Sequence, residues 1–175
     1  MKIETFWQII SNTLEAKTID QQFEILYSEL NELSVEDILD FHRHFLIKMD
    51  ESYTWELWAA AHIIHGDCPE DAFIDFRAWL IFRGKAVFEN AVKNANSLAH
   101  IGKKALLESF DGEEFNYMAA EVYEEKTGRD IEDDENLDGV DFKEDPTGRE
   151  WEEDDLNALV SINPDIYELF KSDWE

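Results

Sequence analysis

Apolar residues recur at every third or fourth position through most of the first 123 residues, which is the period of amphipathic helices. The pattern predicts a first helix through Ile10 and Leu14 and a second helix through Tyr27 and Leu30. A third helix is predicted in SVEDILDFHRHFLIKM, where Ser34 and the acid three residues later form a start that resembles a capping box. Its expected apolar face consists of Val35, Ile38, Leu39, Phe41, Phe45 and Met49.

The stretch WELWAAAHIIHGDCPEDAFIDFRAWL predicts two further helices joined by a tight corner. Gly66 is suited to end the first of them in a left-handed conformation. We then expect Asp67 or Cys68 to cap the second helix, with Pro69 at its first position and acids in its first turn. The aromatic residues repeat at helical spacing, so we expect a buried stripe of Ala72, Phe73, Phe76, Trp79 and Leu80.

The rest of the chain is predicted to be helical with one long interruption. Gly84 predicts a break before KAVFENAV, residues 94–102 are expected to form an irregular or single-turn connection, and GEEFNYMAAEVYEEKTG predicts a helix that ends at Gly128. Residues 129–155 are mostly acids and are expected to form a long loop. Helical order is predicted to return in WEEDDLNALV and in NPDIYELF, with Asn163 as the cap of the latter.

No run of residues alternates between apolar and polar positions in the way that predicts a strand. The sequence therefore predicts an all-α fold, a compact multi-helix single domain over residues 1–175. Within it we expect a helical core over residues 1–128. Residues 129–175 are expected to form an acidic, loop-rich C-terminal arm that is packed on this core or extends from it.

The charge is the most unusual feature of the composition. The formal net charge of the 175 residues is −27, of which −20 falls in residues 108–175. Such a field repels phosphate and anionic headgroups at close range, so we expect no direct binding to nucleic acid or membrane. We expect instead a protein partner with a basic surface, attracted by the acidic arm.

The location follows from two further counts. A single cysteine, Cys68, allows no intrachain disulfide, which is typical of a reducing compartment. No stretch approaches the roughly 20 apolar residues of a membrane-spanning helix. We therefore expect a cytoplasmic protein.

The corner between the two central helices contains residues that bind metals or act as nucleophiles. His62, His65, Asp67 and Cys68 are acceptable zinc ligand types, but their spacing matches no known zinc pattern. The surrounding acids are expected to raise the pKa of Cys68, whereas a helix N-terminus would lower it. No phosphate-binding glycine loop, nucleophile elbow or dinucleotide motif is present. The corner is therefore expected to be a packed helical hairpin.

Four residues in this region remain candidates for binding a small molecule: Glu56, His62, Asp75 and Arg77. If they converged on one open pocket, they could form the site of a metal-dependent or small-molecule enzyme. For Arg77 we expect an ion pair with Glu56, Asp75 or a carboxylate of a neighbouring helix, and the alternative is an anionic ligand.

The acidic arm contains a sequence that resembles a calcium-binding loop. DENLDGVDFKED places Asp134, Asn136 and Asp138 at the first, third and fifth positions, with Gly139 at the sixth and Asp145 at the twelfth. Three features depart from the pattern: the last ligand is an aspartate, Asp141 takes the eighth position, which is normally apolar, and Pro146 follows the loop. A solvated acidic loop is the favoured interpretation. Calcium is the one cofactor that the sequence offers as an alternative.

Three blocks, FWQII, YTWELWAAAHIIHGDCPEDAFIDFRAWLIFRGKAVFENAV and GREWEEDDL, resemble the bacterial family called domain of unknown function 4240. The resemblance covers roughly residues 3–170. It implies a mostly helical domain to which the GREWEEDDL segment belongs. The family brings no established activity, so no site residue is carried over from it. Pro69 departs from the family, in which we expect a serine-like polar residue at that position.

These observations favour a non-enzymatic interaction or regulatory module with an acidic surface that binds a basic partner. Two alternatives stay open: the enzyme centred on Glu56, His62, Asp75 and Arg77, and the calcium-binding loop at residues 134–145.

Overall fold

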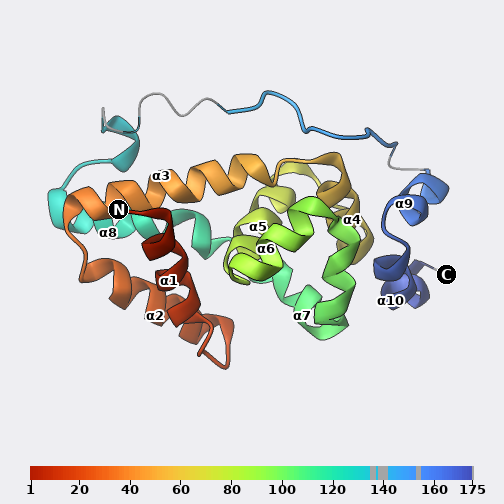
Figure 1. Cartoon of the computed structure of the whole chain (residues 1–175), viewed down its shortest axis with the longest axis horizontal. Helices are drawn as coiled ribbons and strands as arrows, with labels where there is room; N and C mark the ends of the chain where they lie inside the picture. The colour runs from red at the N-terminus through yellow and green to blue at the C-terminus, as the bar shows by residue number, and fades with distance from the viewer. Residues whose placement is uncertain (135–136, 138–141, 153–154, 175) are drawn as a thin grey trace.

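Helices make up nearly all of the regular structure, as the helical period of the sequence predicts (Figure 1). The computed structural model describes residues 1–134, 137, 142–152 and 155–174, and within these ranges it contains no strand. The all-α prediction is confirmed. In chain order the helices are α1 (Ile3–Thr13), α2 (Ile19–Asn31), α3 (Val35–Glu51), α4 (Trp55–His65), α5 (Glu70–Ile81), α6 (Lys85–Lys93), η1 (Ala95–Ile101), α7 (Lys103–Leu107), η2 (Glu108–Asp111), α8 (Glu114–Thr127), η3 (Ile131–Asp133), α9 (Leu156–Ile162) and α10 (Pro164–Trp174).

Local capping signals in the sequence position the ends of α3 and α4. The Ser34 hydroxyl accepts the backbone N–H of Asp37 at 3.1 Å, and Gly66 ends α4 with a φ of 79°. The predicted cap of α5 is wrong, because Pro69 itself occupies the N-cap position and no side chain caps it. Pro69 is extended there, and its carbonyl accepts the N–H of Phe73, so the first helical bond forms without Asp67 or Cys68.

Helix α5 lies at the centre of the fold, where α3, α4, α6, α8 and η2 surround it. The sequence predicts one buried stripe on this helix, but Phe73 and all residues from Phe76 to Ile81 are buried. A helix that is covered on nearly all sides has no solvent-facing stripe for its charged residues. The position of α5 therefore brings Arg77 into the interior.

The structure corrects or refines three local predictions. Leu14 follows the end of α1 and is 44% exposed, and Tyr27 is 38% exposed because its hydroxyl stays at the surface and donates to Glu125. Residues 94–102, predicted to be irregular or a single turn, contain the seven-residue 3₁₀ helix η1 (Ala95–Ile101). Helix α9 begins directly after Asp155, where the predicted loop ends, and Asp155 caps it by accepting the N–H of Ala158.

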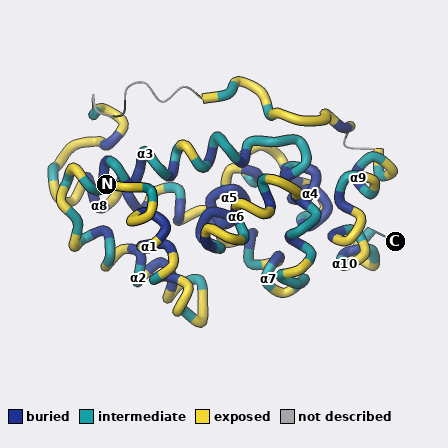
Figure 2. Tube along the Cα trace, viewed as in Figure 1, coloured by how far each residue is buried: buried dark blue, intermediate teal, exposed yellow. Residues whose placement is uncertain are grey.

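The end of the acidic arm packs on the core. Helices α9 and α10 contact α4, and α10 also contacts η1. Leu159, Ile166 and Phe170 have no exposed surface, and Figure 2 shows buried segments on both helices. Helix α10 begins at Pro164 as predicted, and the carbonyl of Asn163 accepts the N–H of Tyr167, but the Asn163 side chain does not cap the helix. The side-chain oxygen of Asn96, from η1, accepts the N–H of residue 165 at 2.9 Å, whereas the amide of Asn163 donates to the carbonyl of Glu56.

Residues 142–152, here called the strap, follow an extended path that joins the region of η3 to α9 (Figure 1). The N–H of Thr147 donates to the carbonyl of Tyr53, and the N–H of Trp55 donates to the carbonyl of Thr147 at 2.8 Å. The indole N–H of Trp151 then donates to the carbonyl of Trp55. These bonds hold the strap against the start of α4 and provide a partner for a backbone N–H that the first turn of a helix leaves unpaired.

Candidate functional site

The four residues that the sequence selects as ligand-binding candidates do not share a pocket. Arg77 lines a groove between α3, α5 and α8, whereas Glu56 lines a separate cavity of about 380 Å³ beside the strap. His62 is buried between the rings of Trp151 and Trp174, whose centroids lie 5.1 and 5.9 Å away.

Glu56 holds the strap and α9 to the core. Its Oε1 accepts the backbone N–H of Arg149 at 3.1 Å, and its carbonyl accepts the amide of Asn163 at 3.0 Å. In this structure Glu56 connects the arm to α4.

Asp75 lies on α5 and accepts a hydrogen bond from the amide of Asn116 at 2.9 Å. Burial raises the pKa of the Asp75 carboxyl above its ordinary value, and the charges of Glu113 and Asp71 raise it further. Asp75 does not line the groove itself, but its hydrogen bond holds the amide of Asn116, which does.

The corner between α4 and α5 contains no assembled metal site. Among the residues that the structure describes, no group of three or more His, Cys, Asp or Glu side chains is arranged to hold a metal ion. His65 contacts the hydroxyl of Ser109 at 2.9 Å, and that hydroxyl donates its only proton to the carbonyl of Leu106. His65 must therefore donate from Nε2. Burial, and then the charge of His62, lower the pKa of His65 to about 4.

Cys68 is buried and is not activated as a nucleophile. Burial, and then the charges of the neighbouring aspartates with Asp67 first, raise the pKa of its thiol to about 12. The sequence predicted that nearby acids raise this pKa and that a helix N-terminus lowers it; burial, which is neither of these effects, is the largest cause of the shift. At neutral pH the group is a thiol, not a thiolate.

The predicted calcium loop lies partly outside the described residues, since Asn136, Asp138 and Gly139 fall there. Of its described ligands, Asp134 accepts the hydroxyl of Tyr123 at 2.7 Å, and Asp145 lies close enough to Tyr53 to raise the pKa of that phenol. Calcium binding at residues 134–145 stays a prediction from the sequence.

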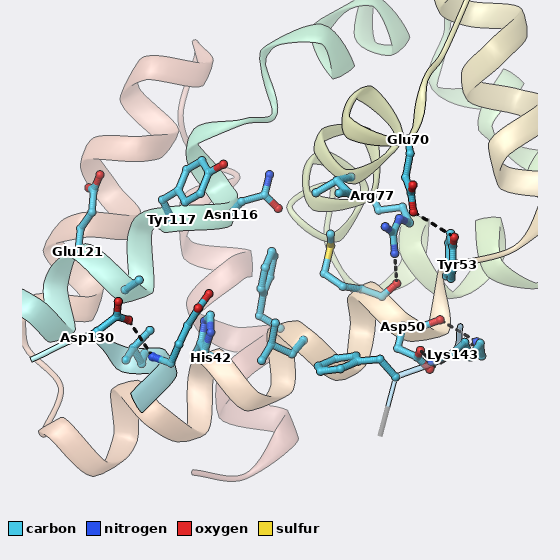
Figure 3. Close-up of a pocket in the computed structure, with 18 of the residues that line it drawn as sticks. His42, Asp50, Tyr53, Glu70, Arg77, Asn116, Tyr117, Glu121, Asp130 and Lys143 are labelled. Carbon is cyan, nitrogen blue, oxygen red and sulfur yellow. Dashed lines mark hydrogen bonds and ion pairs between the residues drawn. The ribbon is translucent and has the colours of Figure 1, made fainter. Parts of the chain in front are cut away.

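A groove of about 730 Å³ lies between helices α3, α5 and α8 (Figure 3). Helix α3 lines one side, α8 lines the other, and residues of α5, η3 and the strap complete it. Its apolar surface comes from Phe45, Leu46, Met49, Ala120 and Ile131. A volume of this size is within the range of known ligand-binding clefts.

Arg77 lies at one end of the groove and is 8% exposed. Its Nη1 donates to the carbonyl of Met49 at 2.8 Å, and it forms no ion pair within the part of the chain that the structure describes. The expected ion pair with Glu56 or Asp75 is therefore not formed. Those two carboxylates are held by Arg149 and Asn116, and the aromatic faces of Tyr53 and Phe73 cover Arg77 instead.

His42 lines the groove from α3 and is 7% exposed. Its Nδ1 has no hydrogen-bond partner among the described residues, and its ring stacks on Phe45 with a centroid distance of 6.4 Å. Burial lowers the pKa of His42 to about 4, so the imidazole is neutral at pH 7. A neutral imidazole between α3 and α8 can donate or accept one hydrogen bond.

The other end of the groove is acidic. Glu121 and Glu124 project from α8, and Asp130 and Glu132 belong to the turn around η3. All four are exposed, and none forms an ion pair with another described residue. Figure 3 shows Glu121 and Asp130 far from Arg77 and Lys143 along the groove. The groove therefore has a strongly negative end and an end that contains its two cations.

Sequence reasoning identified Arg77 and missed the rest of the groove. One signal for His42 was available, because it follows Ile38 by four residues and precedes Phe45 by three, which places it on the predicted apolar face of α3. Asn116 and Glu121 had no such signal, since they look like ordinary surface residues of an acidic helix. Their place in the groove depends on how α8 packs against α3.

Fold and groove together define an all-helical domain with a groove that is acidic at one end. The chain belongs to the family described as protein of unknown function (DUF4240), whose model matches residues 1–125. The match ends near the end of α8, so it includes Arg77 and His42 but not η3, the strap, α9 or α10. No curated protein and no solved structure matches the chain. Within the described residues no helix has the length and apolar character to cross a membrane.

Proposed function

We propose that this protein is a non-enzymatic interaction module that binds a basic segment of a partner protein in the acidic groove. The observation that carries the proposal is the cluster of four exposed carboxylates at one end of the groove, Glu121, Glu124, Asp130 and Glu132, which have no ion pair with any described residue. They lie next to an apolar surface that a peptide can cover.

Charge supports this choice of partner. Like charges at close range repel one another, and the protein as a whole has a formal net charge of −27. A lysine or arginine side chain that enters the acidic end relieves this repulsion without breaking an ion pair between described residues, although Asp130 already accepts the backbone N–H of Glu132 at 2.9 Å. The same field speeds the approach of a basic surface, and salt weakens it.

Aromatic and aliphatic side chains next to the groove support a peptide ligand over a simple counterion. Ile74, Tyr117 and Phe142 are 38%, 55% and 53% exposed, and all three line the groove. Large exposed apolar residues that border one cleft are typical of an interaction surface. Tyr117 precedes Glu121 by four residues on α8, so a basic side chain can contact the ring and the carboxylate together.

The proposal is tested by reversing charge at the groove. A triple variant, Glu121→Lys, Glu124→Lys and Glu132→Lys, is compared with Glu4→Lys, Glu15→Lys and Glu24→Lys, which changes the net charge equally. The control residues are exposed, lie on or beside α1 and α2, and do not line the groove. Binding of a fluorescein-labelled, lysine-rich decapeptide is measured by anisotropy at two salt concentrations.

We expect the groove variant to bind the peptide about tenfold more weakly than the control variant, because three short-range attractions of roughly 0.5 kcal/mol each become repulsions. Equal losses in the two variants would mean that the peptide responds only to net charge. A lack of binding to the wild-type protein at low salt would also reject the proposal.

A further inference from the structure

Arg77 is a buried cation with most of its donors unused. A guanidinium has five N–H donors, yet Arg77 makes a single hydrogen bond, from Nη1 to the carbonyl of Met49. Its Nε is buried without a partner, and Nη2 donates to no described residue. Burial of a charge is unfavourable unless an opposite charge pairs with it. The side chain is therefore suited to receive an anion that is not part of this chain.

The aromatic contacts of Arg77 fix the plane of its guanidinium. Its central carbon lies 4.7 Å from the centroid of Tyr53 and 5.0 Å from that of Phe73. A planar group held in this way presents its donors in a fixed fork, which is the geometry that matches a carboxylate. The bond to Met49 also holds the side chain at the end of α3.

The acids beside Arg77 already have partners. Asp50 accepts the backbone N–H of Lys143 at 2.8 Å, and the Lys143 ammonium lies 3.5 Å from its Oδ2. Glu70 accepts the hydroxyl of Tyr53 at 3.3 Å. The described lining residues at this end include two cations and three acids, Asp50, Glu70 and the exposed Glu144, whereas those at the opposite end include four acids and no base. A ligand with a negative and a positive end would thus have one preferred direction in the groove.

The length of the groove sets the separation of these charges in the ligand. His42, toward the acidic end, and Met49, which holds Arg77, are seven residues apart on α3, or about 10 Å along the helix axis. An extended peptide advances about 3.3 Å per residue, so about three residues span this distance. The matching ligand has a carboxylate and, about three residues earlier, basic side chains.

We propose that the groove binds a basic C-terminal tail, with its terminal carboxylate on Arg77 and its lysine or arginine side chains at the acidic end. The inference rests on the proposed function and adds the direction and the terminus of the ligand. A chain terminus fits this end because the Tyr53–Glu70 and Lys143–Asp50 contacts flank Arg77, as Figure 3 shows. An internal glutamate would require the peptide to continue past these side chains.

The test uses three labelled hexapeptides with the full-length protein. The first has four lysines followed by alanine and leucine and ends in a free carboxylate. The second is its C-terminal carboxamide, and the third is a carboxamide in which glutamate replaces leucine. Non-specific attraction to an acidic protein favours the first carboxamide, which has one more positive charge. We expect the opposite order, with the free carboxylate bound at least tenfold more tightly than either carboxamide.

Protein variants then assign the preference to Arg77. In Arg77→Gln the preference for the free carboxylate is expected to disappear, and in Arg77→Lys it is expected to fall. Arg43→Gln is the matched control, because Arg43 lies on α3, pairs with Asp40 and does not line the groove. The wild-type comparison of the peptides decides the question even if an Arg77 variant does not fold.

The outcomes separate the two proposals. If the carboxamide binds as tightly as the free carboxylate, and charge reversal at the acidic end still abolishes binding, the terminal anchor is wrong and the basic-segment proposal stands. If the glutamate carboxamide matches the free carboxylate, Arg77 takes an internal acid and the C-terminal assignment is wrong. If no peptide binds the wild-type protein, both proposals are rejected.

Discussion

Gly148 in the strap lies directly against the carboxylate of Glu56 in a geometry that only glycine permits. Its φ is +99°, and a Cβ atom there would lie 2.6 Å from Oε1 of Glu56. The next residue, Arg149, donates its backbone N–H to the same oxygen at 3.1 Å. Glu56 is in the first turn of α4, where a negative charge is favourable, so one carboxylate serves both the helix and the strap.

Gly148→Ala is expected to lower the free energy of unfolding by about 2 kcal/mol, from backbone strain and from overlap with Glu56. Thermal denaturation followed by circular dichroism measures the change. Gly128→Ala is the control, because Gly128 has a φ of +68° but no atom within 4 Å of its Cβ position, so only the strain applies. If the two variants lose equal stability, the contact with Glu56 contributes nothing.

A substitution of Phe170 tests whether α9 and α10 unfold together with residues 1–128. Phe170 has no exposed surface, and the Lys103 ammonium lies 4.7 Å from its ring centroid. Phe170→Ala is expected to cost about 3 kcal/mol or more, because it leaves a cavity between α10 and the core. Chemical denaturation measured by tryptophan fluorescence reports the loss.

Phe142→Ala is the matched control for Phe170→Ala, since Phe142 lies in the same arm and is 53% exposed. Its truncation is expected to change the free energy of unfolding by about 0.5 kcal/mol or less. A Phe170 variant as stable as this control would show that α9 and α10 unfold independently of residues 1–128.

Local signals allowed much of the fold to be predicted from the sequence. Ser34 and Gly66 act on residues within a few positions of themselves, so their roles can be read without knowing the fold. The start of α10 shows what such local signals cannot predict. Its cap comes from Asn96, which is 69 residues away, and nothing near residue 164 in the sequence indicates that contact.

The candidate site is harder to predict, because each of its properties depends on several helices. Arg77 was identified, but the expected role was an ion pair with Glu56, Asp75 or a carboxylate of a neighbouring helix, with an anionic ligand as the alternative. Because α5 is central, the nearest acids are held elsewhere and Arg77 faces the groove. Glu121 and Asp130 become candidate binding residues only because α8 and the turn before η3 place them at one end of that groove. The net negative charge can be counted from the sequence, but the clustering of acids at one end of the groove cannot be predicted from it.

Cys68 is expected to be unreactive in the folded protein despite its position at a helix corner. It is 2% exposed, and burial and the neighbouring aspartates raise its thiol pKa to about 12, so very little thiolate is present at pH 8. Labelling with a thiol-specific reagent should be at least about a hundredfold slower than in denaturant, following the rare opening of the structure. Rapid labelling of the folded protein at pH 8 would show that the corner opens readily or that the thiol is activated.

Because His42 is buried, the protein is expected to lose stability in mild acid. The pKa of His42 is about 4 in the folded protein, against 6.5 for an ordinary histidine, because burial disfavours the charged form. The unfolded chain therefore takes up the proton first as the pH falls below 6.5. The resulting loss of stability grows until the pH reaches about 4, and at pH 5 it amounts to about 2 kcal/mol for a fully buried imidazole.

His42→Leu is expected to remove this acid-induced loss of stability, because leucine cannot take up a proton. The measured quantity is the difference in free energy of unfolding between pH 7.5 and pH 5, obtained by urea denaturation of each protein. His65 and the carboxylates are common to both proteins, so their contributions cancel in the comparison. His100→Leu, at an exposed position, should keep the wild-type difference. If His42→Leu also keeps it, the imidazole of His42 is protonated in the folded groove, and the groove is more open to water than the packing of Phe45 against His42 implies.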